Sequence, residues 1–165
     1  MVRKKERFIA LFLAVIMFAL LFVPVSPESI GIYPNADWRR SLYPFFHASF
    51  LHWLLNMVAF LEIVFYTKIR LHYILFSYFI AISYFPDNPF DRGLPTIGFS
   101  GVVFAMLGSV CFHMKFRPMF VLGIVFPLLL GFLFPCVNAA LHAYCYIAGW
   151  MVGLLLYSGD DDKWC

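Results

Sequence analysis

The sequence predicts an all-α membrane protein built as a six-transmembrane-helix bundle, and two observations predict this class. Of its 165 residues, 63% are hydrophobic and only 13% are charged, whereas a soluble domain of this length needs a larger charged surface. Six apolar stretches also reach or approach the roughly 17–25 residues that cross a bilayer core about 30 Å thick. The composition excludes a soluble enzyme, a disordered chain and a disulfide-rich secreted module.

The six expected spans are separated by proline, glycine and charged residues. They cover approximately 8–24, 49–67, 71–85, 98–114, 117–135 and 138–157. The third and fourth are short, and the intervening 86–97 segment is rich in helix breakers. The first span resembles a signal peptide but lacks a small-x-small cleavage site, so we expect it to be retained. Because little chain lies outside the spans, we expect residues 1–165 to form a single domain.

The distribution of Lys and Arg predicts the orientation. With a cytoplasmic N-terminus, nine of the 12 Lys and Arg residues fall on the inner side, as the positive-inside rule requires. Both termini are then cytoplasmic, and we expect a bacterial inner (cell) membrane. The net charge of +3 is small and the basic residues are scattered along the chain. We therefore expect the protein to contact the lipid bilayer and not nucleic acid. The four cysteines show no CxxC spacing, so we expect no metal site and no cofactor.

Polar residues inside the spans are costly in lipid and are therefore functional candidates. With this orientation, five of them lie near the outer face although they come from three different spans: His52, Asn56, Ser100, Asn138 and His142. The orientation was derived from Lys and Arg alone, so this convergence is an independent observation.

The chemistry that fits these residues is acyl transfer. A serine hydroxyl needs a base to become a good nucleophile, and His142 is a candidate base for Ser100. His52 and Asn56 have i, i+4 spacing and share one helix face. Together with the Ser100 amide, they are candidate donors to an oxyanion.

Small residues explain how Ser100 is approached. Gly98 and Gly101 flank it and permit a tight turn into the helix. Another small-residue face, Gly149-x-x-x-Gly153, lies on the sixth span, and two such faces allow helices to pack closely.

These motifs resemble those of the rhomboid family of intramembrane serine proteases over nearly the whole chain. The matching segments, in order, are Trp38-Arg39, His47-x4-His52-x3-Asn56, Gly98-Phe-Ser100-Gly101 with Phe104, and Gly149-x-x-x-Gly153.

The resemblance implies a rhomboid-like six-helix bundle with a water-filled, outward-opening cavity. It implies a serine endopeptidase that cleaves transmembrane segments of single-span membrane proteins. Ser100 is then the nucleophile, while His52, Asn56 and the Ser100 amide stabilise the oxyanion. Phe104 stands where the family usually has a tyrosine that stacks on the catalytic histidine.

The chain differs from the family's pattern in one place, and this difference leaves two interpretations open. The family normally has His-x-x-Gly-x-x-x-Gly in its last span, and that spacing here places Tyr146, not histidine, before Gly149. His142 lies one turn earlier on much the same face. Either His142 is the base, which we favour, or the base is lost. In the second case the chain is a catalytically inactive rhomboid-like protein that binds transmembrane clients. A small transporter is a weaker alternative, because no internal repeat is visible.

Overall fold

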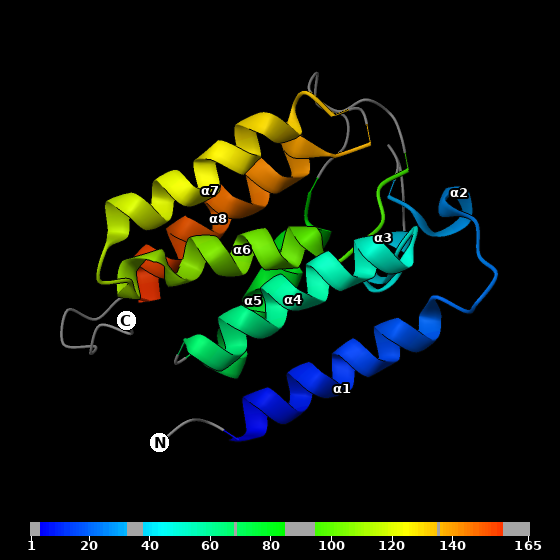
Figure 1. Cartoon of the computed structure of the whole chain (residues 1–165), viewed down its shortest axis with the longest axis horizontal. Helices are drawn as coiled ribbons and strands as arrows, with labels where there is room; N and C mark the ends of the chain where they lie inside the picture. Colours follow the sequence, from blue (N-terminus) through cyan, green and yellow to red (C-terminus); the bar gives the residue numbers. More distant parts are fainter. Residues whose placement is uncertain (1–3, 33–37, 68, 85–94, 135, 157–165) are drawn as a thin grey trace.

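The computed structural model describes residues 4–32, 38–67, 69–84, 95–134 and 136–156, and these are mostly helical (Figure 1). Each expected span has a helix within these residues. They are α1 (Lys4–Leu20), α4 (Phe50–Tyr66), α5 (Leu71–Ile82), α6 (Ser100–Val110) with the 3₁₀ turn η2 (Cys111–His113), α7 (Arg117–Gly131) and α8 (Ala139–Leu156). The all-α class is therefore confirmed.

The segment between α1 and α4 contains helical turns that the sequence did not lead us to expect. They are α2 (Pro27–Ile30), α3 (Arg39–Leu42) and the 3₁₀ turn η1 (Tyr43–Phe45). Prolines stand in the first turns of α2 and η1, where a missing N–H costs nothing. Among the described residues, extended pairing is limited to one antiparallel bridge between Ile32 and Thr96.

Within the described residues, α8 alone is long and apolar enough to cross a membrane by itself. Arg39–Phe45 and Phe50–Tyr66 qualify as a pair but meet at 89°. The helices Leu71–Ile82, Ser100–His113 and Arg117–Gly131 are apolar but shorter. Six complete spans therefore remain a prediction. Most of the 86–97 segment and the chain after Leu156 lie outside the described residues.

The helix α6 lies at the centre of the bundle, with α8, α5 and α4 against it (Figure 1). Its side chains Val102, Ala105 and Met106 are completely buried. Helix α1 packs beside α4, and α7 lies on the other side of the molecule, against α8 and η2. The first residues of α1 and the last of α8 lie at the same end of the bundle (Figure 1).

The backbones of α6 and α8 touch because glycines stand at their crossing. A Cβ on Gly149 would overlap the carbonyl group of Ala105, and one on Gly153 would overlap that of Ser109. From the other helix, a Cβ on Gly108 would overlap the Tyr146 carbonyl. Backbone atoms cannot move aside as flexible side chains can, so this contact requires glycine.

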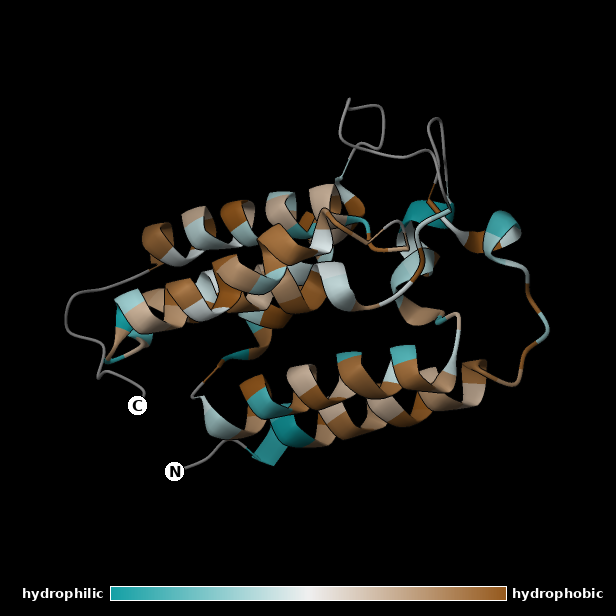
Figure 2. Cartoon of the chain, turned by 45° about the horizontal axis from the view of Figure 1, so that its top comes forward, coloured by the Kyte–Doolittle hydropathy of each residue, from teal (hydrophilic) through white to brown (hydrophobic). Residues whose placement is uncertain are grey.

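Most of the residues in the helices are hydrophobic (Figure 2). On α7, the side chains of Met119, Leu122, Phe126 and Leu129 are all at least 64% exposed. Apolar surface this extensive exceeds what a soluble monomer exposes and is typical of a face that contacts lipid.

The glycine crossing predicts a large difference between two glycine-to-alanine substitutions. We expect Gly149→Ala to lower the unfolding free energy by about 1–3 kcal/mol or more, because its methyl group meets the Ala105 backbone. Gly123→Ala in α7 is the matched control, since nothing lies within 4 Å of its Cβ position, and helix propensity favours alanine. Thermal unfolding in detergent measures both, and equal melting temperatures would contradict the packing described above.

Candidate active site

Ser100 is the first residue of α6, and four hydrogen bonds from backbone N–H groups hold the segment before it. The Thr96 and Ile32 backbones bond each other at 2.9 and 3.3 Å, and the Gly98 N–H donates to the Tyr43 carbonyl at 3.0 Å. The Phe99 N–H donates to Nε2 of His47 at 3.4 Å. The turn that carries Ser100 is therefore fixed by the segment between α1 and α4.

Gly98 allows the His52 ring to lie against this turn. Its φ of +119° is in a region that L side chains rarely adopt. A Cβ here would also stand 2.7 Å from both Cε1 and Nε2 of His52. Both the backbone conformation and the available space therefore require glycine two residues before Ser100.

The structure brings Ser100 and His142 together. Oγ of Ser100 and Nε2 of His142 are 2.8 Å apart, within hydrogen-bond distance. His142 lies in the first turn of α8, and its ring stacks on Phe104 of α6 with centroids 4.4 Å apart and planes 20° apart. The residue that replaces the family's tyrosine thus still supports the histidine ring.

Cys145 explains the spacing between His142 and the glycines of α8, and the sequence analysis did not recognise its role. Cys145 is completely buried, and its Sγ lies 3.4 Å from a Cβ built on Gly101. Cys145 therefore occupies a small-residue position, three residues after the histidine and four before Gly149. The spacing His-x-x-small-x-x-x-Gly would have identified this register.

Tyr146 lies one turn beyond His142 and outside this arrangement. It packs with Ile124 and Leu128 of α7. Its hydroxyl is buried and has no hydrogen-bond partner among the described residues. The geometry therefore gives the contact with Ser100 to His142 and not to Tyr146.

The candidate oxyanion donors lie on one face of α4, as their spacing predicts. The Ala48 N–H approaches Nδ1 of His52 at 3.4 Å, which leaves Nε2 as the protonated nitrogen of the neutral ring. The Asn56 amide is buried and donates to the His52 carbonyl at 2.8 Å. An amide NH₂ group carries two N–H donors, so the second N–H of Asn56 is a candidate donor to an oxyanion.

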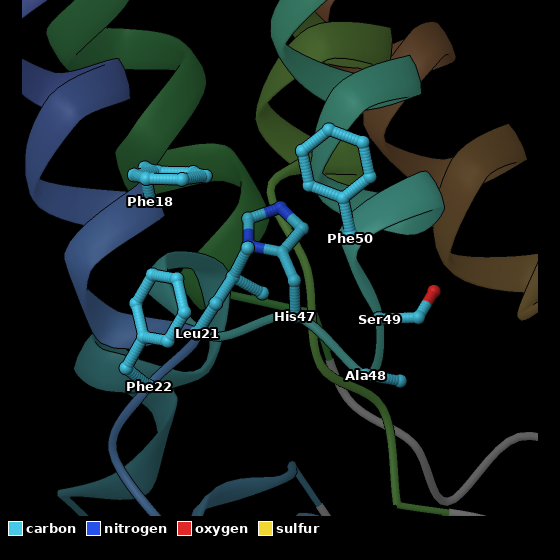
Figure 3. Close-up of a pocket in the computed structure, with 7 residues that line it drawn as sticks. All are labelled: Phe18, Leu21, Phe22, His47, Ala48, Ser49 and Phe50. Atoms are coloured by element: carbon cyan, nitrogen blue, oxygen red, sulfur yellow. The ribbon is translucent and has the colours of Figure 1, made fainter.

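A separate cavity of about 390 Å³ lies beside the site (Figure 3). Its lining residues come from the end of α1 with the two residues that follow it, and from the first residue of α4 with the three that precede it: Phe18, Leu21, Phe22, His47, Ala48, Ser49 and Phe50. Ser100 and His142 are not among them. The His47 ring forms part of its wall and also contacts the His52 ring, with centroids 5.1 Å apart. His47 is thus in contact with both the cavity and the candidate oxyanion donor His52.

His47 predicts a pH dependence of stability. Burial, and secondarily the neighbouring His52, lowers the pKa of His47 from its usual 6.5 to about 4. A depressed pKa means that the unfolded chain binds the proton more strongly, so stability is lost as the pH falls from about 6.5 toward 4. Between pH 7 and pH 4.5, the melting temperature of wild type should fall further than that of His47→Gln, whose amide stays neutral. An equal fall in the melting temperatures of the two proteins would contradict the buried environment assigned to His47.

Ser100 and His142 can perform nucleophilic chemistry as a pair, without a carboxylate as a third member. A neutral His142 can accept the Ser100 proton at Nε2, and the Phe104 ring holds the imidazole in place of a carboxylate. Ser100 is half-buried. The arrangement corresponds to a Ser–His dyad beside protonated donors on α4.

A comparison with known protein families identifies a match. The model of the Rhomboid domain matches residues 34–158, most of the chain and all of the residues discussed above from Trp38 onward. A comparison with curated proteins gives no match.

Proposed function

Because the chain belongs to the rhomboid family, we propose that it is an intramembrane serine protease that cleaves transmembrane segments of other membrane proteins. The observation that carries this proposal is the 2.8 Å contact between Ser100 Oγ and His142 Nε2. The family assignment alone does not distinguish an active protease from an inactive relative, whereas an intact dyad favours activity.

In the proposed reaction, His142 accepts the Ser100 proton as Oγ attacks the scissile carbonyl carbon. The resulting oxyanion is stabilised by the Ser100 N–H, by Nε2–H of His52 and by the second N–H of Asn56. His142 then donates its proton to the leaving amine, and an ester on Ser100 remains. His142 then takes a proton from a water molecule, which attacks the ester, and returns that proton to Ser100 Oγ as the acid product leaves.

The proposed substrates are single-span membrane proteins. A transmembrane helix hides its peptide bonds in internal hydrogen bonds, so the segment must unwind locally before Ser100 can attack. Helix α7 is the best candidate to admit it, because its buried residues are limited to Ile124, Leu128 and Gly131 within the described chain. Pro127 inside α7 also removes one helical hydrogen bond.

The dyad predicts a specific pattern of activity loss. In liposomes with a single-span test substrate, Ser100→Ala and His142→Ala should each lower kcat by at least about 10³-fold. Tyr146→Phe should stay close to wild type, because that hydroxyl lies away from Ser100. Labelling by a fluorophosphonate probe checks the same point without a substrate.

Labelling that persists in Ser100→Ala would assign the nucleophile to another residue. Full activity in His142→Ala would remove the base assignment. A wild-type protein that neither cleaves nor labels, yet still binds transmembrane segments, would identify the inactive alternative.

The donors on α4 predict a loss in kcat with little change in KM. Removal of one oxyanion donor costs about 10²–10³-fold in kcat, and we expect this for Asn56→Ala and for His52→Ala. Asn56→Asp serves as a control of similar size that cannot donate from its ionised form, and it should be equally impaired. Steady-state kinetics provides the measurement, and an unchanged kcat in both alanine variants would exclude this role.

A further inference from the structure

A second side-chain hydrogen bond runs parallel to the contact between Ser100 and His142. Nδ2 of Asn138 donates to Oγ1 of Thr96 at 2.8 Å. Thr96 precedes Ser100 by four residues, and Asn138 precedes His142 by four. Both contacts therefore join residues 42 positions apart. Together they connect the segment 96–100 to the segment 138–142 at both ends.

The Asn138 end of this bond is built into the start of α8. Oδ1 of Asn138 accepts the Leu141 N–H at 2.9 Å, and its carbonyl accepts the His142 N–H at 3.2 Å. This is the pattern of a helix N-cap. One side chain therefore both fixes the first turn of α8, which carries His142, and reaches across to Thr96.

The Thr96 end is anchored independently of α8. Its backbone forms both bonds of the bridge with Ile32, and the Gly98 N–H that follows binds the Tyr43 carbonyl. Thr96 is therefore a fixed reference point against which the beginning of α8 is aligned.

We propose that the Asn138–Thr96 bond is a positioning device that sets His142 Nε2 at its working distance from Ser100 Oγ. This inference rests on the proposed protease function. Close backbone contacts hold α8 against α6 from Tyr146 onward, one turn beyond His142, and the Phe104 ring supports one face of the imidazole. The Asn138–Thr96 bond adds a polar constraint at the start of α8 itself. A displacement of 1 Å in a reacting group costs about 10²-fold in rate.

Three threonine variants separate positioning from general stability. Thr96→Val removes the hydroxyl and keeps the shape, while Thr96→Ser keeps the hydroxyl. Thr67→Val is the matched control, because the Thr67 hydroxyl also makes one hydrogen bond, which it donates to the Ile63 carbonyl at the far end of α4. The full chain in liposomes is labelled with a fluorophosphonate probe, and the maximal labelling rate is separated from the probe's binding constant.

We expect Thr96→Val to lower the maximal labelling rate about 10- to 100-fold and to leave the binding constant within about twofold. Thr96→Ser and Thr67→Val should stay within about threefold of wild type. The two valine variants should have similar melting temperatures, since each loses one hydroxyl hydrogen bond.

Asn138→Ser tests the other end of the bond. Serine retains an N-cap acceptor but is too short to reach Thr96, so the variant should label as slowly as Thr96→Val. The double variant should be no slower than either single one, because both remove the same interaction. Additive losses would contradict the pairing.

A readout without chemistry keeps this inference separate from the proposed function. In protein carrying ¹⁵N-histidine, Ser100→Ala should shift the His142 ring signal when residue 96 is threonine, and this response should be much smaller when it is valine. If wild type does not label at all, the protease proposal fails, and the NMR response alone decides the positioning role. An undiminished response together with wild-type labelling in Thr96→Val would overturn the inference.

Discussion

The direct contact between the backbones of α6 and α8 is the constraint on which the rest of the structure depends. Gly149 and Gly153 on α8 face backbone carbonyls of α6, and Gly108 faces the backbone of α8. Ser100 and His142 project from the first turns of the same two helices. Only a small interhelical separation lets a serine hydroxyl, among the shortest polar side chains, meet an imidazole across the gap.

A second set of contacts acts at the other end of these helices, where the backbone is irregular. Irregular backbone in a membrane protein must find partners within the protein, because lipid offers none. Tyr43, Ile32 and His47 provide such partners for the segment 96–99. The helical turns between α1 and α4 are in turn bound to α5 and to the residues just after it, since Tyr78 of α5 donates to the Ser41 carbonyl and Arg40 donates to the Tyr84 carbonyl. The segment before α4 is therefore part of the scaffold of the site.

Apolar runs located the helices well, because their length and composition reflect a single physical demand. The expected 138–157 span became Ala139–Leu156, and 49–67 became Phe50–Tyr66. The site residues were located by polarity, but the counting of glycines pointed to Tyr146 as the family's histidine position. Cys145 replaces a small residue that such counting assumes to be glycine. Nothing in the sequence distinguishes Thr96 from other loop threonines, and only the folded chain shows its contact with Asn138.

The short α5 has a consequence for the lipids around the bundle. Its 12 residues extend about 18 Å, whereas the 18 residues of α8 extend about 27 Å. A bilayer core about 30 Å thick fits α8 closely but exceeds α5 by several methylene layers. Hydrophobic mismatch costs a fraction of a kcal/mol per Å. With α5 as one of the predicted spans, the acyl chains beside it would have to shorten or tilt, and the lipid annulus would be of uneven thickness.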